Sequence, residues 1–309
     1  MSSNKHGLRP TFLVIGAYKA GTTSLHHYLK QHPQVFMSRI KELRFLTYAG
    51  HQLLPLSSAD LASLAWPVKS LQAYEALFAE AESTQARGDV SPCYLGFAEQ
   101  SILGIQAYIP DAKLIAILRQ PADRAYSSHV YHVSIGQEEE RNFRRVLQFE
   151  VANRMRRVDG KPRRSFARGL YFDNLKCYFQ CFPREQIQVW LYDDLQANAR
   201  MLMRAIFQFI GVDDTFTPDM SIHHNTASWP RLHFAPLVTR KAEHVVSRLI
   251  RQFPKPMRQH LARGYRKLIR TQPPPIDADL RRELTARYRD DILRTQELIG
   301  RDLTHWLEV

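Results

Sequence analysis

One segment near the start of the chain constrains its fold most: a short apolar run, a glycine-bounded loop and an amphipathic stretch. Residues Thr11 to Ile15 (TFLVI) are β-branched and aromatic, which is typical of a buried strand. In the residues that follow, GAYKAGTTSLHHYLKQHP, leucine and tyrosine recur at helical spacing. We therefore expect a strand, a loop and a helix, with the helix ending near Gln31 because Pro33 disfavours its continuation.

The loop from Gly16 to Thr23 has the frame of a phosphate-binding loop. Its glycines let the backbone curl, its amides point inward, and the following helix adds partial positive charge at its N-terminus. Nucleoside triphosphatases carry GxxxxGK[ST] here, whereas this chain has Thr22 at the lysine position and its lysine three residues earlier, at Lys19. The loop predicts an anion-binding site of a different form. Taken alone, it is also compatible with a simple tight turn.

Strands and helices alternate along the first two thirds of the chain. After the first strand, the apolar and β-branched runs predict strands at Val35–Met37, Asp89–Val90, Lys113–Leu118 and Ile187–Tyr192. Helical periodicity predicts helices at 59–65, 71–81, from 121 past 131, and at 142–157, 171–182 and 199–210, the last closed by Gly211. This alternation favours a parallel sheet with helices on both faces, so the fold class is α/β.

The last third of the chain has a helical pattern without strand signals. From Trp229 onward we expect no strand, and the pattern predicts helices at 234–251, 258–270 and 279–299.

A second motif follows a second buried strand. In LRQPADRAYS, Arg119 ends the strand at 113–118 and Ser127 lies two turns into the next helix, so both motifs meet at the same edge of the sheet. Together they resemble the sulfotransferases that use 3′-phosphoadenosine 5′-phosphosulfate (PAPS). YKAGTTS resembles that family's 5′-phosphosulfate loop, and LRQPADRAYS resembles its 3′-phosphate motif, RxPxxRxxS.

The resemblance is closest to the carbohydrate branch, which includes heparan sulfate N- and 3-O-sulfotransferase domains and many bacterial proteins. It extends to KELRF at 41–45 (KEPHFF in the family), GDVSPCYL at 88–95 (GExSPxYL), the Gly169-x-Tyr171 segment and GRDLTHW at 300–306. It implies a P-loop-type parallel sheet flanked by helices on both faces, with a helical C-terminal region. We expect one domain over 1–309, an α/β nucleotide-binding core at 11–228 and a helical extension at 229–309 packed on it.

The resemblance implies a reaction and assigns roles. The chain is expected to move a sulfuryl group from PAPS to a hydroxyl or amine of a carbohydrate-like acceptor by in-line transfer. Lys19 is expected at the bridging oxygen of the donor, and Glu42, in the KE pair, as the base. The expected donor-binding set is Lys19, Ala20, Gly21, Thr22, Thr23, Ser24, Arg119 and Ser127. A solvated loop lysine and an exposed glutamate beside Lys41 are the simpler interpretations of the two catalytic candidates.

Other positions near the motifs stay open. Arg124 is either a 3′-phosphate contact or part of a helix-surface salt bridge. Arg44 stands where the 3-O enzymes have histidine, so acceptor contacts must differ. Family members often place a histidine four residues after the serine, where this chain has Tyr131; we expect its neighbours His129 and His132 to be partly exposed helix residues, with the active site as the alternative.

Two further candidates lie outside these motifs. Residues 225–228 with Arg231 resemble a loop that closes over the nucleotide in bacterial relatives, and an ordinary turn is the alternative. We expect no metal site, since the histidine doublets at 26–27 and 223–224 lack a matching pattern of other ligands and sulfuryl transfer from PAPS requires none.

The charge of the chain indicates anionic partners. Lysine and arginine number 43 against 30 aspartate and glutamate, a net charge of +13. We expect PAPS and adenosine 3′,5′-bisphosphate to bind, with a glycan or small acceptor that is itself anionic or lies on an anionic surface, and we expect no nucleic acid. The basic segments 154–168 and 240–270 leave peripheral membrane contact open. The competing interpretations are a P-loop kinase and a non-catalytic protein that binds polyanions or membrane surfaces.

The expected compartment is the cytoplasm. The first ten residues lack the apolar core of a secretion signal, and no run approaches the ~18 apolar residues that span a bilayer. Cysteine occurs three times, at Cys93, Cys177 and Cys181, and the last two lie one helical turn apart, too far for easy disulfide geometry.

Overall fold

The structure is a computed structural model that describes residues 9–57, 61, 66–83, 85–151, 164–221, 229–230, 252, 257, 261 and 270–308. Several predictions fall largely or wholly outside these residues. They are the helices at 59–65, 234–251 and 258–270, the end of the helix at 142–157, most of the basic segments, and the loop at 225–228 with Arg231.

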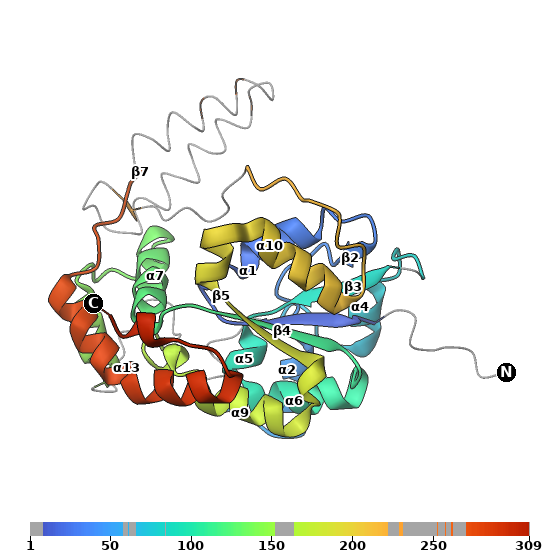
Figure 1. Cartoon of the computed structure of the whole chain (residues 1–309), viewed down its shortest axis with the longest axis horizontal. Coiled ribbons are helices and arrows are strands. Elements are labelled where there is room, and N and C mark those ends of the chain that lie inside the picture. Colours follow the sequence, from blue (N-terminus) through green and yellow to red (C-terminus); the bar gives the residue numbers. More distant parts are fainter. Residues whose placement is uncertain are drawn as a thin grey trace.

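A five-stranded parallel sheet forms the centre of the molecule (Figure 1). Its strands are β1 (Phe12–Gly16), β2 (Val35–Met37), β3 (Ala86–Val90), β4 (Lys113–Leu118) and β5 (Ile187–Leu191), in the order β2-β3-β1-β4-β5. Every residue of β1 is buried, as expected for a strand with neighbours on both sides and helices on both faces. The predicted strands and the α/β fold class are confirmed.

Helices cover both faces of the sheet, as predicted. In Figure 1, α1 (Thr22–Leu29) and α10 (Tyr192–Ile210) lie on one face. On the other lie α2 (Phe45–His51), α5 (Cys93–Gly96), α6 (Ala98–Tyr108) and α9 (Phe172–Cys181). Among the described residues, the remaining helices of more than one turn are α4 (Leu71–Ala76), α7 (Pro121–Ser134), α8 (Phe143–Val151) and α13 (Ala278–Ile299).

Local sequence signals account for several helix ends. Gln120 accepts a 2.8 Å hydrogen bond from the amide of Asp123, and Pro121 occupies the first turn of α7, where a missing amide hydrogen is tolerated. Gly211 ends α10 with a φ of 81°. That helix begins seven residues before the predicted start at 199, because a kink at Asn198 joins two helical stretches.

The prediction of no strand after Trp229 is wrong. Trp229–Pro230 (β6) pairs antiparallel with Arg270–Thr271 (β7). Two residues are too short for a periodic pattern, and this pairing is made by backbone atoms forty residues apart in the sequence. The predicted helix at 279–299 is confirmed as α13, which packs on α7 and α9. The division of one domain at residue 228 stays a prediction.

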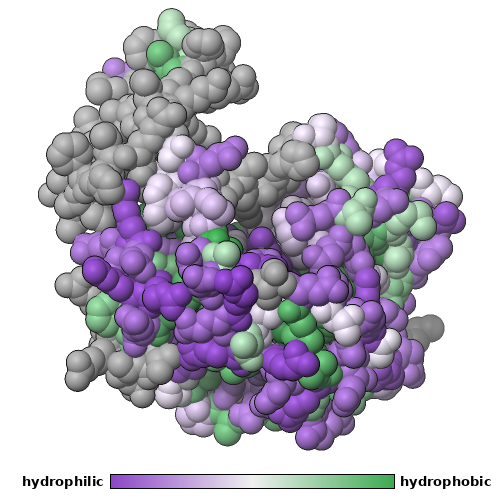
Figure 2. All heavy atoms as spheres, turned by 60° about the vertical axis from the view of Figure 1, so that its left-hand side comes forward, coloured by the Kyte–Doolittle hydropathy of each residue, from purple (hydrophilic) through white to green (hydrophobic). Residues whose placement is uncertain are grey.

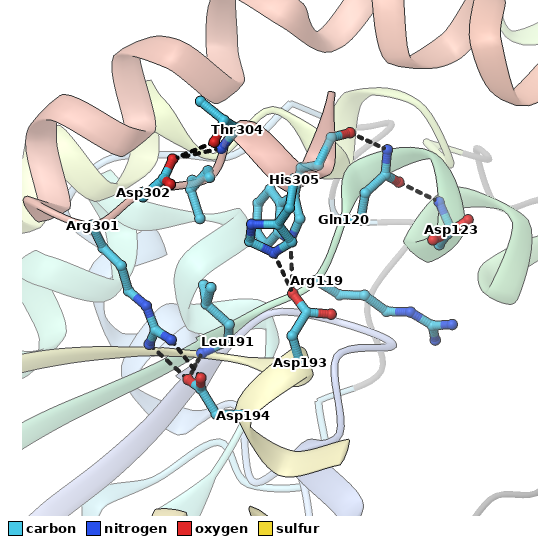
Figure 3. Close-up of polar contacts among 12 residues, drawn as sticks. Arg119, Gln120, Asp123, Leu191, Asp193, Asp194, Arg301, Asp302, Thr304 and His305 are labelled. Carbon is cyan, nitrogen blue, oxygen red and sulfur yellow. Dashed lines mark hydrogen bonds and ion pairs between the residues drawn. The ribbon is translucent and has the colours of Figure 1, made fainter. Parts of the chain in front are cut away.

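The C-terminal residues after α13 lie at the carboxyl edge of the sheet, where they contact the segments that follow two of its strands (Figure 3). Arg301 forms a two-point ion pair with Asp194 at the start of α10. The Trp306 indole donates to Asp193 Oδ2 over 2.7 Å, and its carbonyl accepts from Gln120 Nε2 over 3.1 Å. This tail therefore joins the beginnings of α7 and α10 beside Arg119. Within the described residues, no helix is both long and apolar enough to cross a bilayer.

Candidate active site

The loop after β1 has a conformation that depends on glycine at one position. Gly21 has a φ of 96°, and a Cβ there would lie 2.8 Å from Leu195 Cδ2. Both facts exclude a larger residue without rearrangement. Gly21 also precedes α1 and has no side chain with which to cap that helix, so the first amides of α1, at Thr22, Thr23 and Ser24, are oriented for an anion.

Three cationic side chains gather around this loop from three separate strand ends. Lys19 belongs to the loop itself, Arg119 follows β4, and Lys41 follows β2. Arg119 donates from Nη1 to the Lys19 carbonyl over 3.3 Å, and Lys41 donates from Nζ to Thr23 Oγ1 over 2.6 Å. The structure therefore places Arg119 beside the loop that holds most of the other predicted PAPS-binding residues, at the carboxyl edge of the sheet.

The electrostatics of this cluster favour an anionic ligand. Burial, together with the positive charges of Arg119 and Lys41, lowers the pKa of Lys19 to about 8. Burial likewise lowers the pKa of Lys41. Because the protein disfavours these charges when they have no counterion, an anion bound between them would relieve the penalty.

Glu42 lies beside the cationic cluster on an anchored turn. Its amide donates to the carbonyl of Val90 at the end of β3 over 3.0 Å, and its φ is 63°. Its carboxylate pairs with Arg44 and stands 4.0 Å from the Lys41 ammonium. The Glu42 side chain is about one quarter exposed, so it is less exposed than the simpler interpretation of an exposed glutamate beside Lys41 requires.

A buried carboxylate supports this turn from below. The Arg44 amide donates to Ser91 Oγ over 3.2 Å, and Ser91 donates to Asp89 Oδ1 over 2.7 Å. Tyr74 and Tyr94 donate to the other oxygen of Asp89. Burial raises the pKa of Asp89 to about 6, although these donors oppose the shift. The motif GDVSPCYL thus fixes the position of Glu42 and Arg44 through the end of β3.

Arg119 and Ser127 flank the start of α7. The Arg119 guanidinium lies over the ring of Tyr192, 4.6 Å from its centroid. In Figure 3 its side chain extends away from the Asp193 carboxylate, which the C-terminal tail occupies. Ser127 is half-buried in the second turn of α7. Among the described residues, Arg119 forms no ion pair with a carboxylate; it donates to the Lys19 carbonyl and stacks on Tyr192.

Two interpretations of side chains on α7 are wrong: the helix-surface salt bridge that was one alternative for Arg124, and the expected partial exposure of His129. Arg124 is fully buried and donates to the Ser165 carbonyl, so it forms no helix-surface salt bridge. His129 is 1% exposed, its Nε2 is 3.1 Å from the carbonyl of Arg141, and burial lowers its pKa to about 4. Its ring stacks on Phe143 of α8. Later segments packed on α7 bury both side chains: Ser165 contacts Arg124, and Phe143 contacts His129.

Other side chains at the site were not recognised from the sequence. Tyr131 lies with its ring centroid 4.3 Å from the Lys19 ammonium, while its neighbour His132 is half-buried with Nδ1 3.5 Å from Ser128 Oγ. The Arg168 guanidinium lies 4.6 Å from the ring centroid of Tyr18, which belongs to the glycine loop at 16–23. The signals were present: Tyr131 occupies the position of the family histidine, and Arg168 ends the basic segment that precedes Gly169.

The described residues hold no group of three or more histidine, cysteine, aspartate and glutamate side chains placed to bind a metal ion. All three cysteines are free.

Comparison with known proteins gives the family. A model described as "Sulfotransferase domain" matches residues 9–231, which is most of the chain. The chain therefore belongs to the sulfotransferase family, and the resemblance drawn from its motifs is confirmed.

Individual relatives agree with this assignment. The human bifunctional heparan sulfate N-deacetylase/N-sulfotransferase 2 is 26% identical over 210 residues, and rat carbohydrate sulfotransferase 15 is 26% identical over 246 residues; each match covers 66% of this chain. These matches span 22% and 44% of the two relatives' own lengths. The crystal structure of a sulfotransferase from Alicyclobacillus acidocaldarius is 28% identical, with a TM-score of 0.69, over 96% of this chain and 98% of that one.

Proposed function

We propose that this chain is a PAPS-dependent sulfotransferase that acts on a hydroxyl or amine of a carbohydrate-like acceptor. The observation that carries the proposal is the convergence of Lys19, Lys41 and Arg119 on the glycine loop at the N-terminus of α1. Three cations and a helix N-terminus at one sheet edge suit a donor that carries a phosphosulfate and a second phosphate.

The donor would lie across the two motifs. Its 5′-phosphosulfate is assigned to the loop residues Lys19, Ala20, Gly21, Thr22, Thr23 and Ser24. Its 3′-phosphate is assigned to Arg119 and Ser127, at the start of α7. The stacking of Arg119 on Tyr192 supports this assignment, because it holds the guanidinium in one orientation without using its hydrogen-bond donors.

The transfer itself would be a single in-line displacement. The acceptor oxygen or nitrogen attacks sulfur, the bond from sulfur to the bridging oxygen breaks, and its electron pair stays on the phosphate of adenosine 3′,5′-bisphosphate. Glu42 takes the acceptor proton, and the Lys19 ammonium stabilises the charge that grows on the bridging oxygen. The 4.0 Å between Lys41 and Glu42 supports placing the base next to the sulfuryl group.

The acceptor is proposed to be an anionic glycan. Arg44, which pairs with Glu42, would place one guanidinium group beside the base, and Arg168, which lies over Tyr18, would place a second beside the glycine loop. Two relatives reported above, a heparan sulfate N-deacetylase/N-sulfotransferase and a carbohydrate sulfotransferase, support a glycan as the acceptor. Figure 2 shows a mainly hydrophilic face with scattered hydrophobic residues, which suits a polar ligand better than an apolar one.

Two other features of the proposal concern the setting of the protein. A reducing compartment, the cytoplasm, is proposed on the support of its three free cysteines. Peripheral contact with an anionic membrane surface stays part of the proposal because of the net charge of +13.

The kinase alternative is disfavoured by Asp89. A P-loop kinase needs a carboxylate at a strand end to hold magnesium. Asp89 is next to last in β3, beside β1, but it is 1% exposed and accepts from Ser91, Tyr74 and Tyr94. Its oxygens are therefore committed to the protein.

The experiment that tests the proposal follows sulfur-35 from labelled PAPS into three glycans: heparosan, chondroitin and neutral dextran. We expect label in an anionic glycan, with formation of an equal amount of adenosine 3′,5′-bisphosphate. A Lys19→Ala protein, which keeps the loop without its ammonium, should lose this transfer. Transfer of phosphate from labelled ATP in the presence of magnesium, without sulfur transfer, would contradict the proposal.

A further inference from the structure

The side chain of Lys19 meets an aromatic ring that comes from another element. Its ammonium lies 4.3 Å from the ring centroid of Tyr131, within the ~6 Å range of a cation–π contact. Tyr131 is on α7, one turn beyond Ser127, and the residue is 44% exposed. Because the ring is not enclosed by the core, its place over Lys19 is not explained by core packing.

The other charged groups around Lys19 largely oppose its charge. Arg119 at the end of β4, Lys41 after β2 and Arg124 on α7 each disfavour the ammonium, whereas Glu42 favours it. No carboxylate of the described residues forms an ion pair with Lys19. Together with burial, these surroundings leave the pKa of Lys19 at about 8. In this setting a π-face is one of the few groups that stabilise the charged form.

The backbone of Lys19 is fixed independently of this ring. Its φ is 66°, and its carbonyl accepts from Arg119 Nη1 over 3.3 Å. The loop thus fixes the backbone position of Lys19, and the contact with Tyr131 fixes the position of its ammonium.

We propose that Tyr131 is a positioning residue for the sulfuryl-transfer reaction: the face of its ring holds the Lys19 ammonium over the donor loop and keeps it protonated. The kinetic consequence rests on the proposed function, whereas the contact and its effect on Lys19 do not. Tyr131, four residues after Ser127, thereby stabilises the charged form of Lys19.

Replacing the ring tests this role directly. Tyr131→Leu removes the π-face at an exposed helix position, so the fold should be kept. The charged form of Lys19 then loses a stabilising contact, and its pKa should fall from about 8 by roughly 0.5–1 unit, the size that a partly exposed cation–π contact supports. Tyr131→Phe keeps the ring and should keep the wild-type titration of Lys19.

The measurement is trace acetylation of the native protein with acetic anhydride between pH 6 and 10, read by mass spectrometry at individual lysines. Lys30, exposed at the end of α1, serves as an internal reference. We expect the titration of Lys19 to move to lower pH in Tyr131→Leu alone. Identical titrations in all three proteins would overturn the proposal, and so would a shift in Tyr131→Phe as large as in Tyr131→Leu.

A second readout separates positioning from a merely local contact. The alkaline limb of kcat/KM against pH should move to lower pH in Tyr131→Leu by the same amount as the Lys19 titration. A displaced titration with an unmoved alkaline limb would overturn the positioning role. If no sulfuryl transfer is found with any acceptor, the proposed function fails, while the acetylation result still decides whether Tyr131 supports Lys19.

Discussion

Lys41 donates a 2.6 Å hydrogen bond to the hydroxyl of Thr23 and so joins the turn after β2 to the first turn of α1. Glu42 is the next residue, and its amide is bonded to the end of β3. One short turn therefore brings a cation to the donor loop and the proposed base to its side. In the proposed reaction, Lys41 therefore serves donor binding and the adjacent Glu42 takes the acceptor proton.

Removal of this cation should weaken donor binding. Lys41→Ala deletes one charged donor near the 5′-phosphosulfate, and a hydrogen bond to a charged group is worth about 1.5–3 kcal/mol. We expect the Kd of adenosine 3′,5′-bisphosphate to rise by at least ~10-fold in calorimetry. Lys30→Ala, at the exposed end of α1, is the matched control and should bind as the wild type does. Equal affinities of the two variants would show that Lys41 serves only to hold Thr23.

Donor affinity should depend on pH through Lys19. Its pKa in the folded protein, about 8, is lowered from the ordinary value, chiefly by burial, so below pH 8 the ammonium is charged and available to an anion. Above pH 8 it loses its proton, and affinity for adenosine 3′,5′-bisphosphate should fall, by up to tenfold per pH unit if binding requires the charged form. Binding at pH 8 should also take up protons, seen as a buffer-dependent enthalpy. Lys19→Met should remove both effects; their persistence would assign them to another group.

The same shift has a consequence for stability. The unfolded chain binds more protons than the folded one between pH 8 and the ordinary lysine pKa of 10.5. The penalty from a charged Lys19 is therefore fully present below pH 8 and is relieved as pH rises through this window. Lys19→Met should accordingly increase the free energy of unfolding at pH 7 more than at pH 10, measured by urea denaturation. A difference of the opposite sign would contradict the lowered pKa.

The proposed base should affect turnover and leave donor binding intact. Glu42→Gln keeps the size of the side chain but cannot take the acceptor proton, and loss of a general base typically lowers rates ~10²–10⁴-fold. We expect this loss in kcat, with the affinity for adenosine 3′,5′-bisphosphate within about twofold of wild type. Glu80→Gln, at an exposed pair with Arg39, is the control. Wild-type turnover in Glu42→Gln would remove Glu42 from the mechanism, and the buried His129 is not available to replace it.

Much of the sheet was predictable, for a physical reason. Strands of a parallel sheet with helices on both faces are nearly continuous apolar runs, and β1, β2, β4 and β5 were found that way within one or two residues. The glycine loop was predictable because its residues have a backbone function. By contrast, the sequence does not predict α6, because polar Gln100 and Ser101 lie on its buried side and its polar and apolar residues do not separate into two faces. There α6 packs tightly on α2: a Cβ at Gly104 would lie 2.1 Å from the Leu46 carbonyl.

The candidate site was predictable where it follows local motifs and not where it depends on packing. Lys19, Arg119 and Glu42 lie in the segments that follow parallel strands, and Thr23 lies in the first turn of α1, so their meeting follows from the sheet. The burial of His129 depends on Phe143, fourteen residues later, and the contact of Tyr131 with Lys19 joins segments more than a hundred residues apart. Side-chain spacing along one helix carries no information about either.

The C-terminal tail should be essential for stability. Trp306 is 2% exposed and donates to Asp193, and its carbonyl accepts from Gln120 next to Arg119. Trp306→Ala should lower the free energy of unfolding by about 3–5 kcal/mol in urea denaturation. Trp306→Phe, which keeps an aromatic ring but loses the hydrogen bond to Asp193, should cost less. Equal, small effects of both would show that the tail does not hold α7 and α10 together.

The most direct measurement of the central claim is calorimetry with adenosine 3′,5′-bisphosphate in the absence of metal. The account predicts one-to-one binding to the wild type that is much tighter than binding of adenosine 5′-phosphate, which lacks the 3′-phosphate. Arg119→Ala should lose ~10-fold or more in affinity for the bisphosphate and little for the monophosphate, because the lost hydrogen bonds are to the 3′-phosphate. Equal binding of the two nucleotides by the wild type, or tighter binding of ATP with magnesium, would contradict a PAPS-dependent sulfotransferase.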